Sequence, residues 1–386
     1  MNRADRPVIP ASRYDERLAR AATAAAAAGL DALLIGVGSD LRYLTGYAAM
    51  PLERLTLLVV PASAAPYLVV PRLELGAAEA GVRPAIELRT WGETDDPYRL
   101  ALDGIRGAGT AAVAVSDTML AMHVLRLQEG LAAAGAAVPM QLASAVLRDL
   151  RMVKDADEIA LLRLAAQAAD RVVASIAAGR LVGRTEADVA RDVRERLIAE
   201  GHEEAHFAIV GSGPNSASPH HDASERVIRA GEPIVLDIGG TLDGYGSDIT
   251  RTLWVTGGDP ARGPDERFRH LFGVLDAAQA AGTRAVRPGV RCEGVDQAAR
   301  AIIDDEGYGE AFFHRTGHGI GLDGHEDPYL VAGNDLPLAE GMAFSVEPGI
   351  YLPGEYGARI EDIVVCGPDG PIVLNRAPRE LWVVDG

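Results

Sequence analysis

Apolar runs alternate with amphipathic stretches over the first part of the chain. The Ala-rich segment from Tyr14 to Leu30 predicts a helix that ends at Gly29. The short apolar runs DALLIG, LTLLVV and PYLVV predict strands, and RLELGAAEA between later runs has helical periodicity. Strands that alternate with helices indicate an α/β layer.

The same pattern continues to a polar joint, RMVKDADE. Before it, AAVAVS predicts a strand, and a helix is expected from Thr118 to about Ala134. We place the domain boundary near Arg151, which gives an α/β domain at residues 1–150 and a second domain at residues 151–386. The segment DLRYLTGY, Asp40 to Tyr47, is too polar and aromatic for a core strand, so we expect a loop edge or a contact surface there.

In the second domain, the segment Pro233–Val255 predicts a β-hairpin. Two runs rich in Ile, Val, Leu and Thr flank the dipeptide Asp243-Gly244. This dipeptide favours a tight turn with positive φ, and the strands on either side then pair antiparallel.

The register of this hairpin brings two acidic residues together. With the turn at its tip, Asp237 faces Thr250 and Asp248 faces Gly239, so the two aspartates are diagonal neighbours on one face, about 7–8 Å apart between Cα atoms. Carboxylates that close repel each other, and a bound cation removes the repulsion. The alternative is that one Asp caps a loop while the other faces solvent.

The second domain also contains an internal repeat. Gly183–Gly213 aligns without gaps with Gly289–Gly319, and each copy predicts a helix followed by a strand. The continuation pairs the acidic positions as well, Asp237 with Glu347 and Asp248 with Glu361. We therefore expect two halves related by a pseudo-twofold axis, with four carboxylates at the seam.

One histidine motif is misleading. His202 to His206 spells HEEAH, which fits the HExxH pattern of zinc peptidases. That pattern needs both imidazoles on one face of a continuous helix, but Gly201 predicts a helix end and the residues from Phe207 onward read as a strand. We therefore expect no zinc site here.

A second histidine segment, His314 to His325, has a different character. HRTGHGIGLDGH presents His314, His318 and His325 from a Gly-rich stretch that cannot form a regular helix and that lets the backbone approach a ligand closely. Any one of them alone reads as an ordinary loop histidine. Beside four acidic residues, they indicate a reactive site. The glycine spacing does not fit a dinucleotide-binding loop.

Composition narrows the range of partners. The net charge of −18 argues against nucleic acid and acidic membrane surfaces, which leaves a small molecule or a peptide. The stretch MNRADRPVIPASRYDE has no apolar core, and no run approaches the ~20 apolar residues of a membrane span, so we expect a cytoplasmic protein. Cys292 and Cys366 read as ordinary buried thiols.

Taken in order, the motifs resemble those of a known family. VLDIGG with GYGSDITRT, HRTGHGIGLDGHE, SVEPGIY and RIEDIV resemble the ligand motifs of the pita-bread metallopeptidases, which include methionine aminopeptidase, aminopeptidase P and Xaa-Pro dipeptidase (prolidase). The resemblance spans the second domain, and the first domain resembles the creatinase/prolidase N-terminal domain. It implies an α+β pita-bread fold with an internal pseudo-twofold repeat.

The resemblance also implies a site for two divalent metal ions. It makes Asp237 a ligand of one metal, Asp248 and Glu361 bridging carboxylates, and His318 and Glu347 ligands of the second metal. Carboxylates and imidazole without thiolate suit hard or borderline ions, and four negative charges balance two divalent cations. Mn²⁺ is expected ahead of Co²⁺ or Zn²⁺.

Further roles follow from the same resemblance. It implies catalytic functions for His220, His325 and Glu347, with His220 preferred to its neighbour His221. Three more residues are expected on the substrate side: His314, Tyr351 and Arg359. Arg359 either orients acidic residues or binds a carboxylate.

The implied activity is hydrolysis of the Xaa-Pro bond of a small peptide with proline at its second position. Two metal ions about 3.5–4 Å apart activate water and polarise the carbonyl, so no Ser or Cys nucleophile is needed. Xaa-Pro dipeptidase is the main expectation; the alternatives are Xaa-Pro aminopeptidase (aminopeptidase P) and, more remotely, a creatinase-like hydrolase of non-peptide C–N bonds. The resemblance further implies a homodimer, in which Asp40–Tyr47 reaches toward the partner's site.

Overall fold

The computed structural model describes residues 6–105, 112–133, 135 and 140–386. Its contacts divide the chain into two compact units, Ile9–Arg151 and Met152–Gly386, and the segment that ends at Val8 is grouped with the second unit. Within the described residues, no helix is both long and apolar enough to cross a membrane.

The Ile9–Arg151 unit is an α/β layer, as predicted. Its described strands form one mixed sheet in the order β4-β3-β2-β1-β5-β6. The strands are β1 (Leu30–Ile35), β2 (Leu57–Pro61), β3 (Tyr67–Pro71), β4 (Glu87–Trp91), β5 (Ala112–Val115) and β6 (Met140–Leu142). The helices are α1 (Ala11–Ala27), α2 (Ser39–Thr45), η2 (Arg72–Glu74), α3 (Leu75–Gly81), α4 (Pro97–Leu102), α5 (Ala121–Ala133) and α6 (Ser144–Met152), which ends at the first residue of the next unit.

Two helix boundaries differ from the predictions. The first helix begins at Ala11 rather than Tyr14, after the extended Pro10, whose ring cannot donate a backbone hydrogen bond. The helix predicted from Thr118 begins at Ala121, because Ser116–Met119 forms a hydrogen-bonded turn first. Its predicted end at Ala134 lies outside the described residues.

The prediction of a loop at Asp40–Tyr47 is wrong. Most of this segment lies in helix α2, which ends at Gly46 in the left-handed conformation with φ 79°. Leu41, Leu44 and Thr45 are buried and share one helical face by their spacing of three and four residues. The polar and aromatic composition concealed this short apolar stripe.

The first half of the Met152–Gly386 unit is a hairpin-based sheet covered by two helices. Its described strands are ordered β17-β9-β8-β7. They are β7 (Glu204–Ser212), β8 (Glu232–Leu242), β9 (Tyr245–Val255) and β17 (Trp382–Val384). Helices α7 (Ala156–Ala177) and α8 (Glu186–Ala199) pack on this sheet, and η3 (Gly213–Ala217) follows β7.

The second half repeats this plan. Its described strands are ordered β11-β10-β12-β15-β16, beside a separate pair, β13 with β14. The strands are β10 (Gly317–Gly319), β11 (Glu326–Leu330), β12 (Ala343–Val346), β13 (Gly349–Leu352), β14 (Tyr356–Arg359), β15 (Asp362–Gly367) and β16 (Gly370–Val373). The helices are η4 (Pro260–Arg262), α9 (Glu266–Ala285), α10 (Cys292–Asp305) and η5 (Gly309–Ala311).

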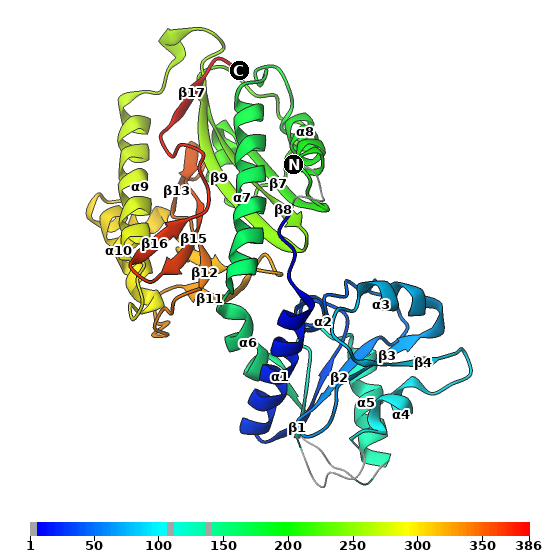
Figure 1. The fold of residues 1–386 in the computed structure, drawn as a ribbon. Coiled ribbons are helices and arrows are strands. Elements are labelled where there is room, and N and C mark those ends of the chain that lie inside the picture. Colours follow the sequence, from blue (N-terminus) through cyan, green and yellow to red (C-terminus); the bar gives the residue numbers. More distant parts are fainter. Residues whose placement is uncertain (1–5, 106–111, 134, 136–139) are drawn as a thin grey trace. The chain divides into compact units, whose positions relative to one another are not determined.

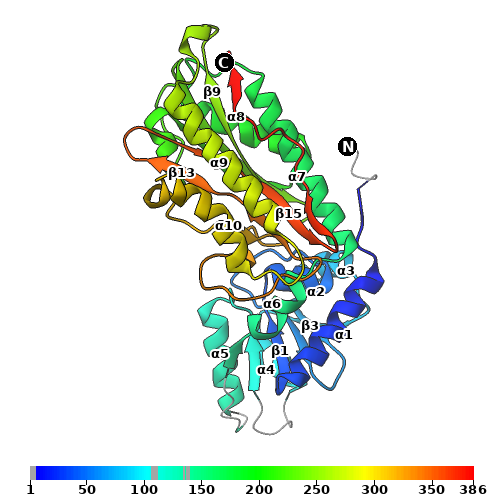
Figure 2. The same ribbon diagram turned by 90° about the vertical axis from the view of Figure 1, so that its left-hand side faces the viewer.

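The predicted internal repeat is confirmed. Helices α8 and α10 begin and end at aligned positions, and the antiparallel set β7-β8-β9 corresponds to β10-β12-β15. Figure 1 shows α7 and α8 in green with the first sheet, and α9 and α10 in yellow with the second; Figure 2 gives the perpendicular view. The second copy is less regular, since β10 has 3 residues where β7 has 9.

The hairpin of β8 and β9 has the predicted register. Asp237 pairs with Thr250 and Gly239 with Asp248. At its tip, Asp243 has φ 49° and the following glycine φ 87°, as a turn with two positive φ angles requires. On β8, residues such as Leu236 and Ile238 pack against the helices, so the alternate residues, Asp237 among them, face the opposite side.

Both cysteines are unpaired and buried, as predicted. Cys292 and Cys366 belong to the core that joins α10 to β12 and β15. Burial raises the pKa of each thiol to about 11, so both remain protonated at neutral pH.

Candidate metal-binding active site

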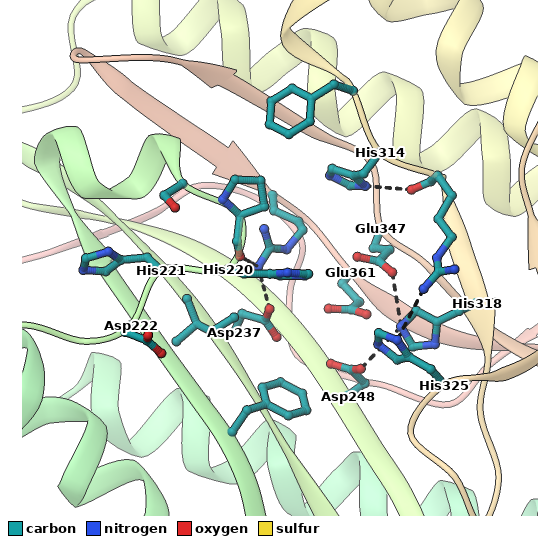
Figure 3. Close-up of a pocket in the computed structure, with 17 residues that line it drawn as sticks. His220, His221, Asp222, Asp237, Asp248, His314, His318, His325, Glu347 and Glu361 are labelled. Atoms are coloured by element: carbon teal, nitrogen blue, oxygen red, sulfur yellow. Dashed lines mark hydrogen bonds and ion pairs between the residues drawn. The ribbon is translucent and has the colours of Figure 1, made fainter. Parts of the chain in front are cut away.

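Residues from both repeats line one pocket of about 790 Å³. Its wall includes all five predicted metal ligands (Figure 3): Asp237, Asp248, His318, Glu347 and Glu361. They come from strands far apart in the sequence, since Asp237 lies on β8, Asp248 on β9 and His318 on β10, Glu347 follows β12, and Glu361 connects β14 to β15. The two-half architecture therefore brings together the acidic residues that the repeat pairs.

Backbone and side-chain hydrogen bonds attach Glu361 to the hairpin. Its N–H donates to the carbonyl of Thr250 at 3.1 Å, and the Thr250 hydroxyl donates to Glu361 Oε2 at 2.7 Å. The neighbouring Arg251 reinforces the junction, because its guanidinium donates to the Glu361 carbonyl at 2.6 Å and to Asp362 Oδ1 at 2.6 Å. The seam between the halves is thus fixed next to the carboxylates.

The ring of His318 is oriented with one nitrogen toward the acidic residues. Its Nδ1 donates to the carbonyl of Gly319 at 3.1 Å, which leaves Nε2 without a proton in the neutral ring. Nε2 then lies 3.3 Å from Glu347 Oε1 and 3.7 Å from Asp248 Oδ2. A lone pair beside carboxylate oxygens is repulsive unless a cation lies between them, and an imidazole anchored this way is typical of a metal ligand.

The electrostatics of the cluster also require a positive charge. Burial raises the pKa of Asp248 and of Glu361 well above the ordinary range, and the neighbouring carboxylates raise both further. Burial likewise raises the pKa of Glu347 to about 7, against the opposing influence of Arg359. The carboxyl groups therefore cannot all ionise at neutral pH in the protein alone.

The residues fit divalent metal ions. Potential ligand atoms of Asp248, His318 and Glu361 lie within 4.8 Å of one another, and all three residues are buried. Asp237 contributes a buried Oδ1 that has no hydrogen-bond partner within the described part of the chain. Hard oxygen donors with one imidazole, and four carboxylates to balance two divalent charges, suit such ions.

Arg359 is committed to holding Asp237. Its Nη2 donates to Asp237 Oδ2 and, at 3.1 Å, to the carbonyl of Pro219, while Nε donates to the Thr250 hydroxyl at 3.1 Å. Nη1 donates to the Tyr351 hydroxyl at 2.7 Å. Of the two roles left open by the sequence, the geometry favours orientation of the acidic residue over binding of a substrate carboxylate.

Tyr351, expected on the substrate side, lies outside the residues that line the pocket. Tyr351 is fully buried and does not line the pocket, because it packs behind His314 and Arg359. His314 does line the pocket, with its Nδ1 donating to the carbonyl of Arg315 at 2.7 Å and its Nε2 accepting from the Tyr351 hydroxyl at 3.0 Å. Burial lowers the pKa of His314 to about 4, which agrees with this neutral tautomer.

The adjacent histidines after β7 differ in their environment. Figure 3 shows His220 over Asp237, whereas His221 lies farther out beside Asp222. The ring of His221 is bonded through Nε2 to Glu186 Oε2 at 2.7 Å. This arrangement agrees with the preference for His220 as the group that faces the metal ligands.

His325 packs directly on the imidazole of His318. The two ring centroids are 3.8 Å apart with an interplanar angle of 39°. Its Nδ1 lies 3.3 Å from Nη2 of Arg315. The other flank of the cluster therefore carries an exposed imidazole within reach of a bound substrate.

The HEEAH motif does not lie on one continuous helix, as predicted. Helix α8 ends at Ala199, Gly201 has φ 107°, and the two histidines lie on different elements. His202 is buried, with Nδ1 3.2 Å from the carbonyl of Leu197 and Nε2 2.8 Å from the Ser247 hydroxyl. His206 lies exposed on β7 beside Glu204.

Sequence reasoning missed a buried carboxylate, Glu186, that holds the loop carrying the adjacent histidines. Glu186 begins α8 and is fully buried. It accepts hydrogen bonds from Ser212 N and Oγ, Asn215 Nδ2, His221 Nε2, and Ser224 N and Oγ. These partners are distant in sequence, so no local pattern pointed to them.

Sequence reasoning also missed the buried Lys154, although the composition of the chain sets this residue apart. Lys154 is the only lysine among 37 basic residues of the chain. Its side chain is 1% exposed, and Nζ forms an ion pair with Glu326, the residue after His325. This buried ion pair fixes the residue next to His325 to the start of the Met152–Gly386 unit.

Three buried carboxylates, a fourth that is partly exposed, and an imidazole at the seam of a duplicated α+β unit define a metal-dependent hydrolase of the pita-bread type. The chain belongs to metallopeptidase family M24, whose model matches residues 160–368. The Creatinase/Prolidase N-terminal domain model matches residues 17–153.

Named relatives cover nearly the whole chain. A probable dipeptidase PepE of Mycobacterium bovis is 50% identical over 96% of this chain and 96% of its own. A Xaa-Pro dipeptidase of Lactobacillus helveticus is 34% identical over 89% of this chain and 92% of its own. The crystal structure of dipeptidase PepE from Mycobacterium ulcerans superposes with a TM-score of 0.88 at 49% identity, covering 97% of this chain and 99% of that one.

Proposed function

We propose that this protein is a Xaa-Pro dipeptidase that acts with two divalent metal ions, of which Mn²⁺ is the preferred candidate ahead of Co²⁺ and Zn²⁺. The observation that carries the proposal is the convergence of four carboxylates, three of them buried, and the Nε2 of His318 in one pocket. The names of the relatives, dipeptidase and Xaa-Pro dipeptidase, supply the substrate class.

Each ligand residue receives a role. Asp237 would hold one ion and His318 with Glu347 the other, and Asp248 and Glu361 would supply carboxylate oxygens to both. The geometry that supports this is the unbonded Oδ1 of Asp237 on one side and the His318–Glu347 contact of 3.3 Å on the other. When bound, such ions supply an activated water and polarise the peptide carbonyl.

The remaining side chains of the pocket bind and orient the peptide. His220 and His325 approach from opposite flanks of the ligand cluster and are exposed, so both can donate a hydrogen bond to the peptide oxygen as charge develops on it. Glu347 lines the same pocket and is the carboxylate that we propose to accept a proton from water.

Apolar surface for the proline ring is present in the same pocket. Phe207, Ile209 and Phe313 line it, and Phe313 is 64% exposed. Proline at the second position lacks an N–H, so a site for it needs a shaped apolar wall more than a backbone acceptor. His314 borders this wall, its ring 6.3 Å from that of Phe313.

We also propose a cytoplasmic homodimer. Buried, unpaired cysteines suit a reducing compartment. The dimer rests on the similarity to family members with the same N-terminal domain.

Kinetics with three peptides test the proposed activity. We expect kcat/KM to be highest for Ala-Pro, lower for Ala-Pro-Ala and near background for Ala-Ala, with Mn²⁺ present. A chelator should abolish all hydrolysis, and added Mn²⁺ or Co²⁺ should restore it. A preference for Ala-Pro-Ala would indicate aminopeptidase P instead. If none of the peptides is hydrolysed, the creatinase-like hydrolase of non-peptide C–N bonds becomes the favoured alternative.

A further inference from the structure

We infer that Arg315 binds the free C-terminal carboxylate of the dipeptide substrate. The inference rests on the proposed function and identifies the residue that would make the enzyme a dipeptidase rather than an aminopeptidase. It starts from a difference between the two arginines of the pocket, Arg315 and Arg359.

These two arginines are the only Lys or Arg side chains among the described residues that line the pocket. Arg359 has its donors directed to Asp237, Tyr351, Thr250 and Pro219, as described above. A substrate carboxylate would have to displace one of these bonds and leave a buried partner unsatisfied, at a cost comparable to the bond gained. Arg359 is therefore a poor receptor for the substrate.

Arg315 has no carboxylate partner within salt-bridge distance in the part of the chain that the structure describes. Its contacts are a single hydrogen bond to His325 Nδ1 at 3.3 Å and stacking on the ring of Tyr329, with Cζ 4.4 Å from the ring centroid. Stacking leaves the edge of a guanidinium open, and that edge matches a carboxylate with two parallel hydrogen bonds.

The position of Arg315 relative to the metal ligands matches the size of the substrate. In an Xaa-Pro dipeptide the carboxylate carbon is only two bonds from the proline nitrogen, so its receptor must lie beside the reacting carbonyl. The guanidinium contacts His325, whose ring is 3.8 Å from that of the predicted ligand His318. One imidazole thus separates the cation from the candidate metal centre.

The backbone around Arg315 is held firmly. Its carbonyl accepts from His314 Nδ1 at 2.7 Å, and the next residue, Thr316, donates through Oγ1 to the buried Asp296 at 2.7 Å. Arg300, paired with Asp296, also donates to the carbonyl of His314 at 2.8 Å. A receptor anchored in this way loses little conformational freedom when it binds.

The acidic charge of the pocket also supports a role for Arg315 in binding a carboxylate. Asp222 also lines the wall and is not one of the predicted metal ligands, so its carboxylate attracts the α-amine of a peptide and repels its carboxylate even when the four ligand charges are balanced by metal. A cation on the far side of His325 gives the dipeptide a fixed orientation, with its amine and its carboxylate at opposite ends.

The test compares Ala-Pro with Ala-Pro-amide, which lacks the carboxylate charge. In the wild type we expect a higher kcat/KM for Ala-Pro. In Arg315→Met the ratio of the two kcat/KM values should fall about tenfold to a hundredfold, mainly through KM for Ala-Pro. Arg315→Lys keeps the charge without the planar fork and should give an intermediate ratio. Arg229→Met, on an exposed arginine outside the pocket, is the matched control and should keep the wild-type ratio.

Two further measurements separate recognition from a structural role. Metal content by elemental analysis should be the same in the wild type and both Arg315 variants. On the wild type alone, L-proline should inhibit hydrolysis competitively and more strongly than L-prolinamide, a result that does not depend on any variant folding.

Several outcomes would overturn the inference. Equal losses on Ala-Pro and Ala-Pro-amide in Arg315→Met would mean that Arg315 acts through the metal centre or the fold. Equal inhibition by L-proline and L-prolinamide would exclude a carboxylate receptor of any kind. Failure of the proposed function gives a different result in the wild type: an aminopeptidase P would prefer Ala-Pro-amide to Ala-Pro, and a C–N hydrolase of non-peptide substrates would hydrolyse neither.

Discussion

Glu186→Gln is predicted to loosen the loop that carries His220 and His221. Burial alone would raise the pKa of Glu186, but hydrogen bonds from Ser224, His221 and Ser212 outweigh it and lower the pKa from 4.5 to about 2. The folded state therefore favours the carboxylate by about 3 kcal/mol at neutral pH, at about 1.4 kcal/mol per pKa unit.

The hydrogen bonds around the carboxylate give a similar estimate of the stability that Glu186→Gln would lose. In the Gln variant, one oxygen becomes an NH₂ group that faces the backbone N–H of Ser212 or of Ser224, depending on how the amide turns. Either arrangement leaves a buried donor unsatisfied, which costs about 1–3 kcal/mol, and removes charge-assisted bonds. For a unit of this size, about 3 kcal/mol corresponds to a fall in Tm of about 6–12 °C.

The assay is thermal unfolding of the wild type, Glu186→Gln and, as a control, Glu225→Gln, which changes an exposed carboxylate near the same loop. The contribution of a group with a depressed pKa is present above its unfolded-state pKa and disappears as the pH falls from about 4.5 toward 2. The Tm difference should therefore be full at pH 7 and shrink in that acidic window. Equal Tm values for Glu186→Gln and wild type at pH 7 would refute the reasoning.

Three other predictions concern the rest of the molecule. His202→Ala and His206→Ala should leave metal content unchanged by elemental analysis, because neither side chain reaches the pocket; loss of metal would restore the zinc-peptidase reading of HEEAH. Lys154→Met should lower the free energy of unfolding by about 3–5 kcal/mol in chemical denaturation, since it removes the buried ammonium beside Glu326, and unchanged stability would show that the ion pair is dispensable. Light scattering of the active enzyme should give the mass of a dimer, and a fully active monomer would contradict the homodimer.

The features that the sequence predicted correctly are those with short-range or periodic causes. The register of the β8–β9 hairpin follows from one turn dipeptide and the period of two, and the structure has the predicted pairing of Asp237 with Thr250. The repeat predicted the matched helices α8 and α10 because duplication preserves spacing. These two patterns sufficed to bring the acidic residues to one seam.

The features that it did not predict depend on packing between distant segments. The hydroxyl of Tyr351 bonds to Arg359 and His314, so its burial results from tertiary contacts. The role of Glu186 likewise depends on partners that only the folded chain assembles. In helix α2, burial of Leu41 and Leu44 outweighed the polar composition that suggested a loop.

Metal stoichiometry tests the central claim most directly. Wild-type protein, Asp248→Asn and Asp243→Asn should be loaded with Mn²⁺, freed of excess metal and analysed by elemental analysis beside an Ala-Pro hydrolysis assay. Asp243 is the matched control, because it lies on the same hairpin with φ 49°, a conformation that Asn tolerates. We predict two equivalents and full activity for the wild type and the control, and loss of at least one equivalent together with hydrolysis in Asp248→Asn. An Asp248→Asn protein that keeps both its metal and its activity would contradict the account.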